Sequence, residues 1–139
     1  MDTIIEKVDS GHIDTDVMEQ AGKLIAEGEL VAFPTETVYG LGGDALDPDA
    51  SRKIYAAKGR PSDNPLIVHI ADFDDMKRVA REVPEQAKKL ADAFWPGPLT
   101  MIVWKSDAVP EATTGGMQTV AVRMPNHPVA LDLIRKSGC

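Results

Sequence analysis

Cysteine is almost absent from this chain of 139 residues, because its single cysteine is the last residue, Cys139. One thiol gives neither an internal disulfide framework nor a thiolate cluster for a metal. Long apolar runs are also missing, since none approaches the roughly 18 residues that a membrane-spanning helix needs. The N-terminus lacks the basic segment and apolar stretch of a signal peptide. A cytoplasmic protein that does not enter a membrane is expected.

Aromatic residues make up only 5% of the chain, and 15 basic residues stand against 22 acidic ones. Broad RNA-binding surfaces combine many basic residues with aromatic rings that stack on bases, so this composition does not favour one. Residues 50–62 nevertheless contain no acidic residue and four basic ones: Arg52, Lys53, Lys58 and Arg60. This basic island fits a compact anionic ligand, or cations that interact favourably with the C-terminal end of a helix.

Hydrophobic residues form 43% of the chain, and its length fits one globular domain. Helix signals open at Asp16 and at Asp47-Pro48, and further helices are predicted over 72–81, 84–94 and 128–136. Strands are predicted over 30–33, 39–45, 66–70, 99–104 and 119–123. This alternation predicts an α/β domain with a central, largely buried sheet. Because another strand is expected after the last helix, the domain is expected to be incomplete at its C-terminus.

Thr35 and Thr37 follow the predicted strand 30–33. Ligands of open α/β sheets bind beyond the carboxyl ends of the strands, so both hydroxyls could face a cleft, with Tyr39 as an aromatic wall. Alternatively, the threonine hydroxyls bond to nearby backbone groups in a turn. Both interpretations remain open on the sequence alone.

Lys58 and Arg60 flank Gly59, which lets the backbone approach a ligand while both cations reach the same anion. The chain contains no glycine-rich loop that ends in Gly-Lys-Ser or Gly-Lys-Thr, so a standard P-loop is excluded. The pair therefore predicts a phosphate site of another kind.

Two polar residues lie near the ends of predicted strands. His69 shares one face of strand 66–70 with Ile67 and is either a core residue or part of a site. Arg123 ends strand 119–123 with Thr119 on the same face, so the strand could present a guanidinium and a hydroxyl to one pocket. An Arg123 that faces solvent is the alternative. No protein-held metal is predicted, because the three histidines lack closely spaced ligand partners.

Five motifs occur in order: Pro-Thr-Glu-Thr-Val-Tyr-Gly-Leu at 34–41, Lys-Gly-Arg-Pro at 58–61, Asn-Pro-Leu at 64–66, Trp-Pro-Gly-Pro-Leu-Thr at 95–100 and Val-Ala-Val-Arg-Met-Pro at 120–125. Together they resemble the YrdC-like family of L-threonylcarbamoyladenylate synthases, over roughly residue 14 to the end. The resemblance implies a twisted mixed sheet flanked by helices, with a wide, positively charged cavity. It also implies a nucleotidyltransferase that makes L-threonylcarbamoyl-AMP and pyrophosphate from L-threonine, bicarbonate and ATP. The product would feed threonylcarbamoylation of tRNA adenosine by downstream partner proteins.

By position, the resemblance implies an L-threonine-binding set of Thr37, His69 and Arg123, with Thr35 in the same motif. It implies an ATP-binding set of Lys58, Arg60, Asn64 and Thr119. Mg²⁺ is expected to arrive on the phosphates of ATP, and no catalytic base is assigned. Family members continue into a further Ser-x-Asn motif beyond the position of Cys139. Residues 1–139 are therefore expected to be a truncated YrdC-like domain that releases pyrophosphate more slowly than the full-length protein.

Two other functions remain open. A non-catalytic RNA-binding or translation-associated module would bind RNA weakly and with a steep dependence on salt. A carbamoyl-transfer relative from hydrogenase maturation would be larger and carry extra domains, of which this sequence shows no trace. The oligomeric state is not predicted.

Overall fold

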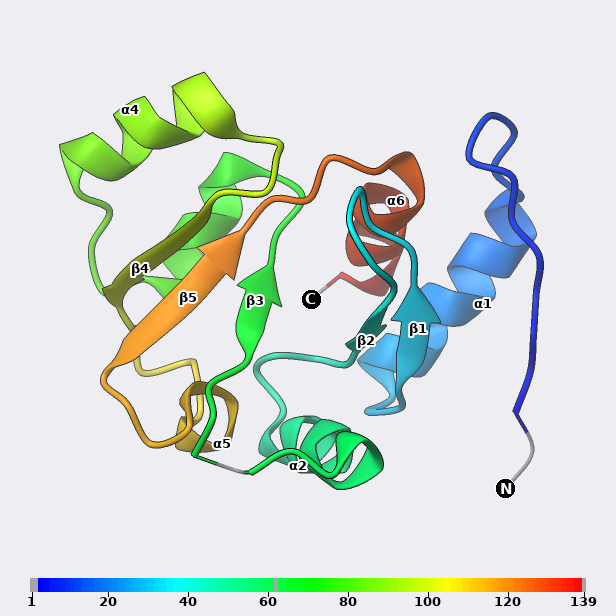
Figure 1. Cartoon of the computed structure of the whole chain (residues 1–139), viewed down its shortest axis with the longest axis horizontal. Helices are drawn as coiled ribbons and strands as arrows, with labels where there is room; N and C mark the ends of the chain where they lie inside the picture. The colour runs from blue at the N-terminus through cyan, green and yellow to red at the C-terminus, as the bar shows by residue number, and fades with distance from the viewer. Residues whose placement is uncertain (1–2, 62, 139) are drawn as a thin grey trace.

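Two separate sheets organise the computed structural model, which describes residues 3–61 and 63–138 (Figure 1). Strands β1 (Val31–Phe33) and β2 (Gly40–Gly42) form an antiparallel pair. Strands β3 (Ile67–His69), β5 (Thr119–Arg123) and β4 (Thr100–Trp104) form the second sheet in that order. Since β3 runs parallel and β4 antiparallel to β5, this sheet is mixed. The α/β class is confirmed, but the expected central sheet is divided in two.

The helices surround both sheets and have these bounds: α1 (Thr15–Ala26), α2 (Pro48–Lys58), η1, a 3-10 turn (Phe73–Asp75), α3 (Met76–Val79), α4 (Glu85–Phe94), α5 (Glu111–Thr114) and α6 (Pro128–Ser137). Figure 1 shows α1 and α6 side by side next to β1, and α4 beside β4 at the other end of the molecule. Among the described residues, no helix has the length and apolar character needed to cross a membrane.

Local capping groups explain where the helices begin and end. Asp47 accepts a hydrogen bond from the Asp49 N–H at 2.9 Å, and Gly59 ends α2 in the left-handed region at φ 62°, as predicted. The predicted cap Asp16 is wrong by two residues. Asp14 has the extended backbone of a cap, and its carboxylate accepts from the N–H groups of the first turn of α1, to which Asp16 belongs.

Each sheet has its own apolar core. The first core joins α1, β1 and α6 through six buried residues: Met18, Ile25, Phe33, Val129, Ala130 and Leu133. The second core joins β3, β4, β5 and α3 around five fully or nearly fully buried residues: Val68, Ile70, Met76, Val120 and Val122. The cavity described below lies between these two halves.

The mixed sheet is buried on one face, so it is less covered than the largely buried sheet expected. In β4, Met101 and Val103 are buried, and Met101 packs against α4 through Ala87 and Ala91. The alternate residues point the other way, and Ile102 is 71% exposed. Because His69 and Arg123 share this open face with Ile102, the open face gives polar side chains access to a ligand.

Helices α1 and α6 approach each other closely at Gly22. A Cβ atom at this position would lie 2.6 Å from the backbone carbonyl carbon of Lys136. No side chain fits there unless one of the two helices moves, so glycine sets the spacing of this helix pair.

Candidate functional site

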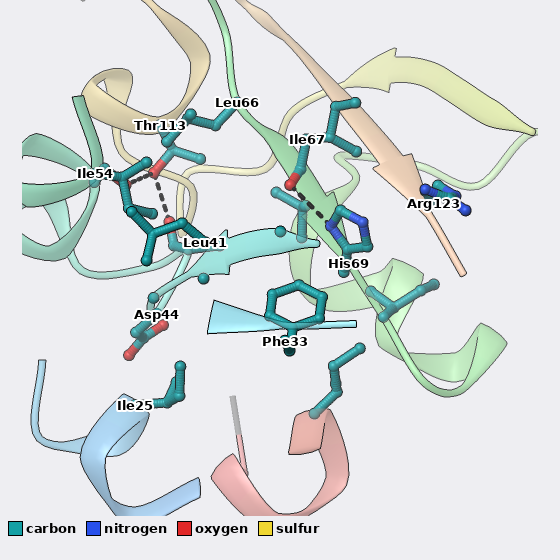
Figure 2. Close-up of a pocket in the computed structure, with 18 of the residues that line it drawn as sticks. Ile25, Phe33, Leu41, Asp44, Ile54, Leu66, Ile67, His69, Thr113 and Arg123 are labelled. Atoms are coloured by element: carbon teal, nitrogen blue, oxygen red, sulfur yellow. Dashed lines mark hydrogen bonds between the residues drawn. The ribbon is translucent and has the colours of Figure 1, made fainter. Parts of the chain in front are cut away.

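A cavity of about 320 Å³ lies between the two sheets (Figure 2). Its lining is mostly apolar, but four basic residues (Lys58, Arg60, Arg78 and Arg123) outnumber two acidic ones (Asp44 and Asp75). The lining includes six of the eight predicted site residues: Thr35, Thr37, Lys58, Arg60, His69 and Arg123. Hydroxyls, cations and an imidazole from segments far apart in the sequence therefore line one cavity.

The carboxyl ends of three strands meet at this cavity. His69 ends β3, Arg123 ends β5, and the two residues are partners in the parallel ladder. Phe33 ends β1 and meets the His69 ring edge to face, with ring centroids 5.9 Å apart (Figure 2). The cavity thus occupies the place where open α/β sheets bind their ligands.

The loop after β1 holds its threonines by local hydrogen bonds. The Thr35 hydroxyl donates to the Val38 carbonyl oxygen at 2.6 Å and accepts from the Thr37 N–H at 3.2 Å. The two threonine hydroxyl oxygens are 3.1 Å apart. The turn and the cleft interpretations of these residues are therefore both correct, since a self-bonded turn lines the cavity with two hydroxyls. Tyr39 lies at the rim, 77% exposed.

Lys58 and Arg60 have different surroundings. The Arg60 guanidinium donates from Nε to the Asn64 carbonyl oxygen at 3.2 Å and from Nη2 to the Pro65 carbonyl oxygen at 2.6 Å. Arg60 is therefore fixed by the loop that follows it. Lys58 is exposed, and its ammonium forms no hydrogen bond or ion pair with any residue of 3–61 or 63–138. The site combines one fixed and one movable cation.

Two predicted nucleotide-binding residues lie outside the lining of this cavity. Asn64 is exposed and meets the site through its backbone carbonyl, which also accepts from the Tyr55 hydroxyl at 2.9 Å. Thr119 shares a face with Arg123 but pairs with Trp104 at the opposite end of β5. Four residues of strand span about 13 Å, and Thr119 is not part of the cavity lining that includes Arg123. Their proposed contacts with ATP stay predictions.

Glu36 and Gly97 are site residues that the sequence did not reveal. The Glu36 carboxylate forms an ion pair with the Arg123 guanidinium through Oε1 and accepts from the Asn126 N–H through Oε2 at 2.5 Å. The Gly97 carbonyl oxygen accepts from Arg123 Nε at 3.1 Å. The prediction of a solvent-facing Arg123 is excluded, because its side chain is only 12% exposed.

Two groups of the site have shifted pKa values. Burial by itself raises the pKa of Glu36, but the Asn126 N–H and the Arg123 cation outweigh burial and hold that pKa below its usual value. Burial lowers the pKa of His69, and Arg123 acts in the same direction against the opposing influence of the Ile67 carbonyl and Glu36. His69 Nδ1 lies 3.3 Å from the Ile67 carbonyl oxygen, which fits a neutral ring protonated on Nδ1 (Figure 2).

His69 is expected to make the protein less stable as the pH falls. The unfolded chain protonates His69 near its ordinary pKa of about 6.5, whereas the folded chain resists protonation. Stability is therefore lost from about pH 6.5 downward, until the lowered folded pKa is reached. Thermal unfolding between pH 7.5 and 5.5 should show a smaller decrease in Tm for His69→Asn than for the unchanged protein. His12→Asn, which removes an exposed imidazole, is the control and should follow the unchanged protein.

The described residues contain no cluster of three or more His, Cys, Asp or Glu that could hold a metal ion. The polar groups at the cavity are instead hydroxyls, an imidazole and cations. Such groups suit an anionic ligand that also has hydrogen-bonding groups.

The mixed sheet and the cationic cavity at its strand ends define an α/β domain with a cavity suited to small anionic molecules. A model of the family Sua5_yciO_yrdC, described as telomere recombination, matches residues 23–139. The chain belongs to this family.

The chain is also similar to individual proteins. The threonylcarbamoyl-AMP synthase of Pyrococcus abyssi is 60% identical over 117 residues, which are 84% of this chain and 34% of that protein. The Bacillus subtilis protein of the same name is 59% identical over 120 residues, 86% of this chain and 35% of its own length. The crystal structure of P. abyssi Sua5 complexed with L-threonine matches with a TM-score of 0.94 at 55% identity, over 98% of this chain and 40% of that one. The chain thus spans about a third of the length of these curated relatives.

Proposed function

We propose that this chain is the part of a threonylcarbamoyl-AMP synthase that binds L-threonine beside ATP. The observation that carries the proposal is the meeting of Thr37, His69 and Arg123 with Lys58 and Arg60 at one cavity. The similarity to an enzyme of this name, and to a Sua5 structure complexed with L-threonine, supports the same assignment.

The cavity suits a reaction between two substrates that each carry an anionic group, the carboxylate of L-threonine and the phosphates of ATP. Arg123 would bind the carboxylate of L-threonine, while Lys58 and Arg60 would neutralise the phosphates of ATP. The deprotonated amine of threonine forms a bond to the carbon of bicarbonate as water leaves. A carbamate oxygen then bonds to the α-phosphorus of ATP as the bond to pyrophosphate breaks. The residues contribute charge neutralisation and alignment, and Mg²⁺ would arrive with the phosphates.

The product defines the wider role that we propose. Threonylcarbamoyl-AMP is an activated acyl adenylate, and a nucleotidyltransferase that makes it would supply threonylcarbamoylation of tRNA adenosine. A downstream protein would complete the transfer to tRNA.

Pyrophosphate release by the whole protein in which this chain occurs tests the proposal. Release should require ATP, L-threonine and bicarbonate, and omission of either threonine or bicarbonate should reduce it to background. Pyrophosphate release that continues without both would contradict a synthase and indicate simple ATP hydrolysis.

Lys58→Ala should raise the Kd of ATP by roughly ten- to a hundredfold, because a charge-assisted hydrogen bond to phosphate contributes about 1.5–3 kcal/mol. Isothermal titration with ATP measures this change. Lys89→Ala, which removes an exposed cation from α4, should leave the affinity unchanged. Equal ATP affinity in the two variants would remove Lys58 from the proposed site.

A further inference from the structure

Glu36 has no role in the function proposed above, although its carboxylate contacts a residue of the cavity wall. We propose that Glu36 is a positioning residue for Arg123, which it holds at the cavity wall in the orientation that receives the carboxylate of L-threonine. The identity of the ligand, L-threonine, rests on the proposed function. The contacts between Glu36 and Arg123 are independent of that proposal.

The loop after β1 presents alternate residues to different surroundings. Thr35 and Thr37 line the cavity, whereas Glu36 between them is not part of the lining. Hydrogen bonds between the two threonines fix this alternation. Glu36 therefore supports Arg123 from outside the cavity and leaves the space in front of the guanidinium to a ligand.

The hydrogen bonds of Arg123 leave one edge of its guanidinium for a ligand. Guanidinium has five N–H donors in a planar fork. Its Nε donates to the Gly97 carbonyl and Nη2 donates to Glu36 Oε1, so the protein engages the Nε–Nη2 edge. Within residues 3–61 and 63–138, no hydrogen bond involves Nη1. The Nη1–Nη2 edge is thus oriented and available for two parallel bonds to a carboxylate.

Glu36 also connects two segments that are distant in the sequence. Its Oε1 reaches Arg123 at the end of β5, and its Oε2 accepts from the backbone N–H of Asn126 just beyond. The Glu36 side chain is 22% exposed, so water competes only in part for these contacts. Loss of the carboxylate would release both the Arg123 guanidinium and the loop after β1 that carries Thr35 and Thr37.

The cations at the other side of the cavity have separate support. Arg60 is held by the carbonyl oxygens of Asn64 and Pro65, whereas the hydrogen bonds of the Glu36 carboxylate in the described part of the chain go to Arg123 and Asn126. A change at Glu36 should therefore affect L-threonine binding and leave ATP binding intact. A general loss of structure would weaken both.

Glu36→Gln in the whole protein tests the inference, because glutamine keeps the size of the side chain and removes its charge. The Kd of L-threonine should rise by about tenfold, and the Kd of ATP should change by less than about twofold. In ¹⁵N NMR spectra, the Arg123 Nε–H signal should exchange with water faster than in the unchanged protein. Glu19→Gln, on the exposed side of α1, is the matched control and should alter none of these three values.

The outcomes separate this inference from the proposed function. If the unchanged protein binds no L-threonine, the proposed function fails, and the Arg123 Nε–H signal alone decides the inference. The inference is overturned if the Arg123 Nε–H exchanges with water no faster in Glu36→Gln than in the unchanged protein. It is also overturned if the Kd of L-threonine is unchanged. Equal losses for threonine and ATP also overturn it, since they indicate a structural role.

If Glu36→Gln does not fold, Glu36→Asp tests the inference instead. Aspartate keeps the charge but is shorter by one methylene group, so it should loosen Arg123 and weaken threonine binding without affecting ATP. An unchanged threonine Kd in Glu36→Asp would overturn the inference.

Discussion

Arg123→Ala is expected to weaken L-threonine binding by about a hundredfold or more. Truncation removes the guanidinium edge that would pair with the substrate carboxylate, and it leaves the Glu36 carboxylate without its cation. Two charge-assisted hydrogen bonds to a carboxylate contribute about 1.5–3 kcal/mol each, so their loss corresponds to a hundredfold or more in affinity. Breaking the Glu36–Arg123 pair costs folding stability instead. The loss of this ion pair should also appear as a lower Tm.

Titration calorimetry with L-threonine, and a thermal melt without ligand, measure the two effects of Arg123→Ala. Arg52→Ala is the matched control, because Arg52 forms an exposed ion pair with Asp49 on α2 and lies outside the cavity lining. Exposed pairs of this kind contribute about 0–1 kcal/mol, so both values should stay near those of the unchanged protein. Threonine affinity within twofold of normal in Arg123→Ala would contradict the assigned contact.

Gly22→Ala is expected to destabilise the fold by about 2 kcal/mol, although alanine is the better helix former. Alanine by itself would stabilise the interior of α1 by about 1 kcal/mol relative to glycine. Its Cβ would lie 2.6 Å from the backbone of Lys136 in α6, however, and overpacking of this kind costs up to about 3 kcal/mol. A backbone carbonyl cannot move aside as the tip of a side chain can.

The decrease in Tm for Gly22→Ala should be about 8 °C for a domain of this size. Gly11→Ala is the control, because a Cβ there would make an ordinary contact 3.5 Å from Asp9 Oδ1. A Tm that increases in Gly22→Ala would show that helix propensity outweighs packing, and that α1 and α6 can separate at little cost.

Local signals made much of the fold predictable. The limits of α2 follow from Asp47, Pro48 and Gly59, which act within a few residues of the positions they specify. Helix α5 (Glu111–Thr114) was not predicted, since four residues carry no periodic pattern. The division into two sheets was not predictable either, because strand pairing depends on contacts between distant segments.

The candidate site shows the same limit. Motif order and strand-end placement brought six residues to one cavity correctly. Glu36 was missed because its partner Arg123 is 87 residues away, and nothing near Glu36 in the sequence identifies that pairing. The sequence placed Thr119 on the correct face of β5. The face that a residue occupies does not show how far along the strand it lies, and Thr119 and Arg123 are at opposite ends of β5.

The separation of β1–β2 from β3–β5–β4 has a consequence for motion. No backbone hydrogen bond within residues 3–61 and 63–138 connects the two sheets. Each sheet can therefore open its amides to solvent without disrupting the ladder of the other. The Glu36–Arg123 ion pair already links the loop after β1 to β5. A molecule bound at once by Thr37 and Arg123 would add a second link, so its binding would couple the opening of the two sheets more strongly.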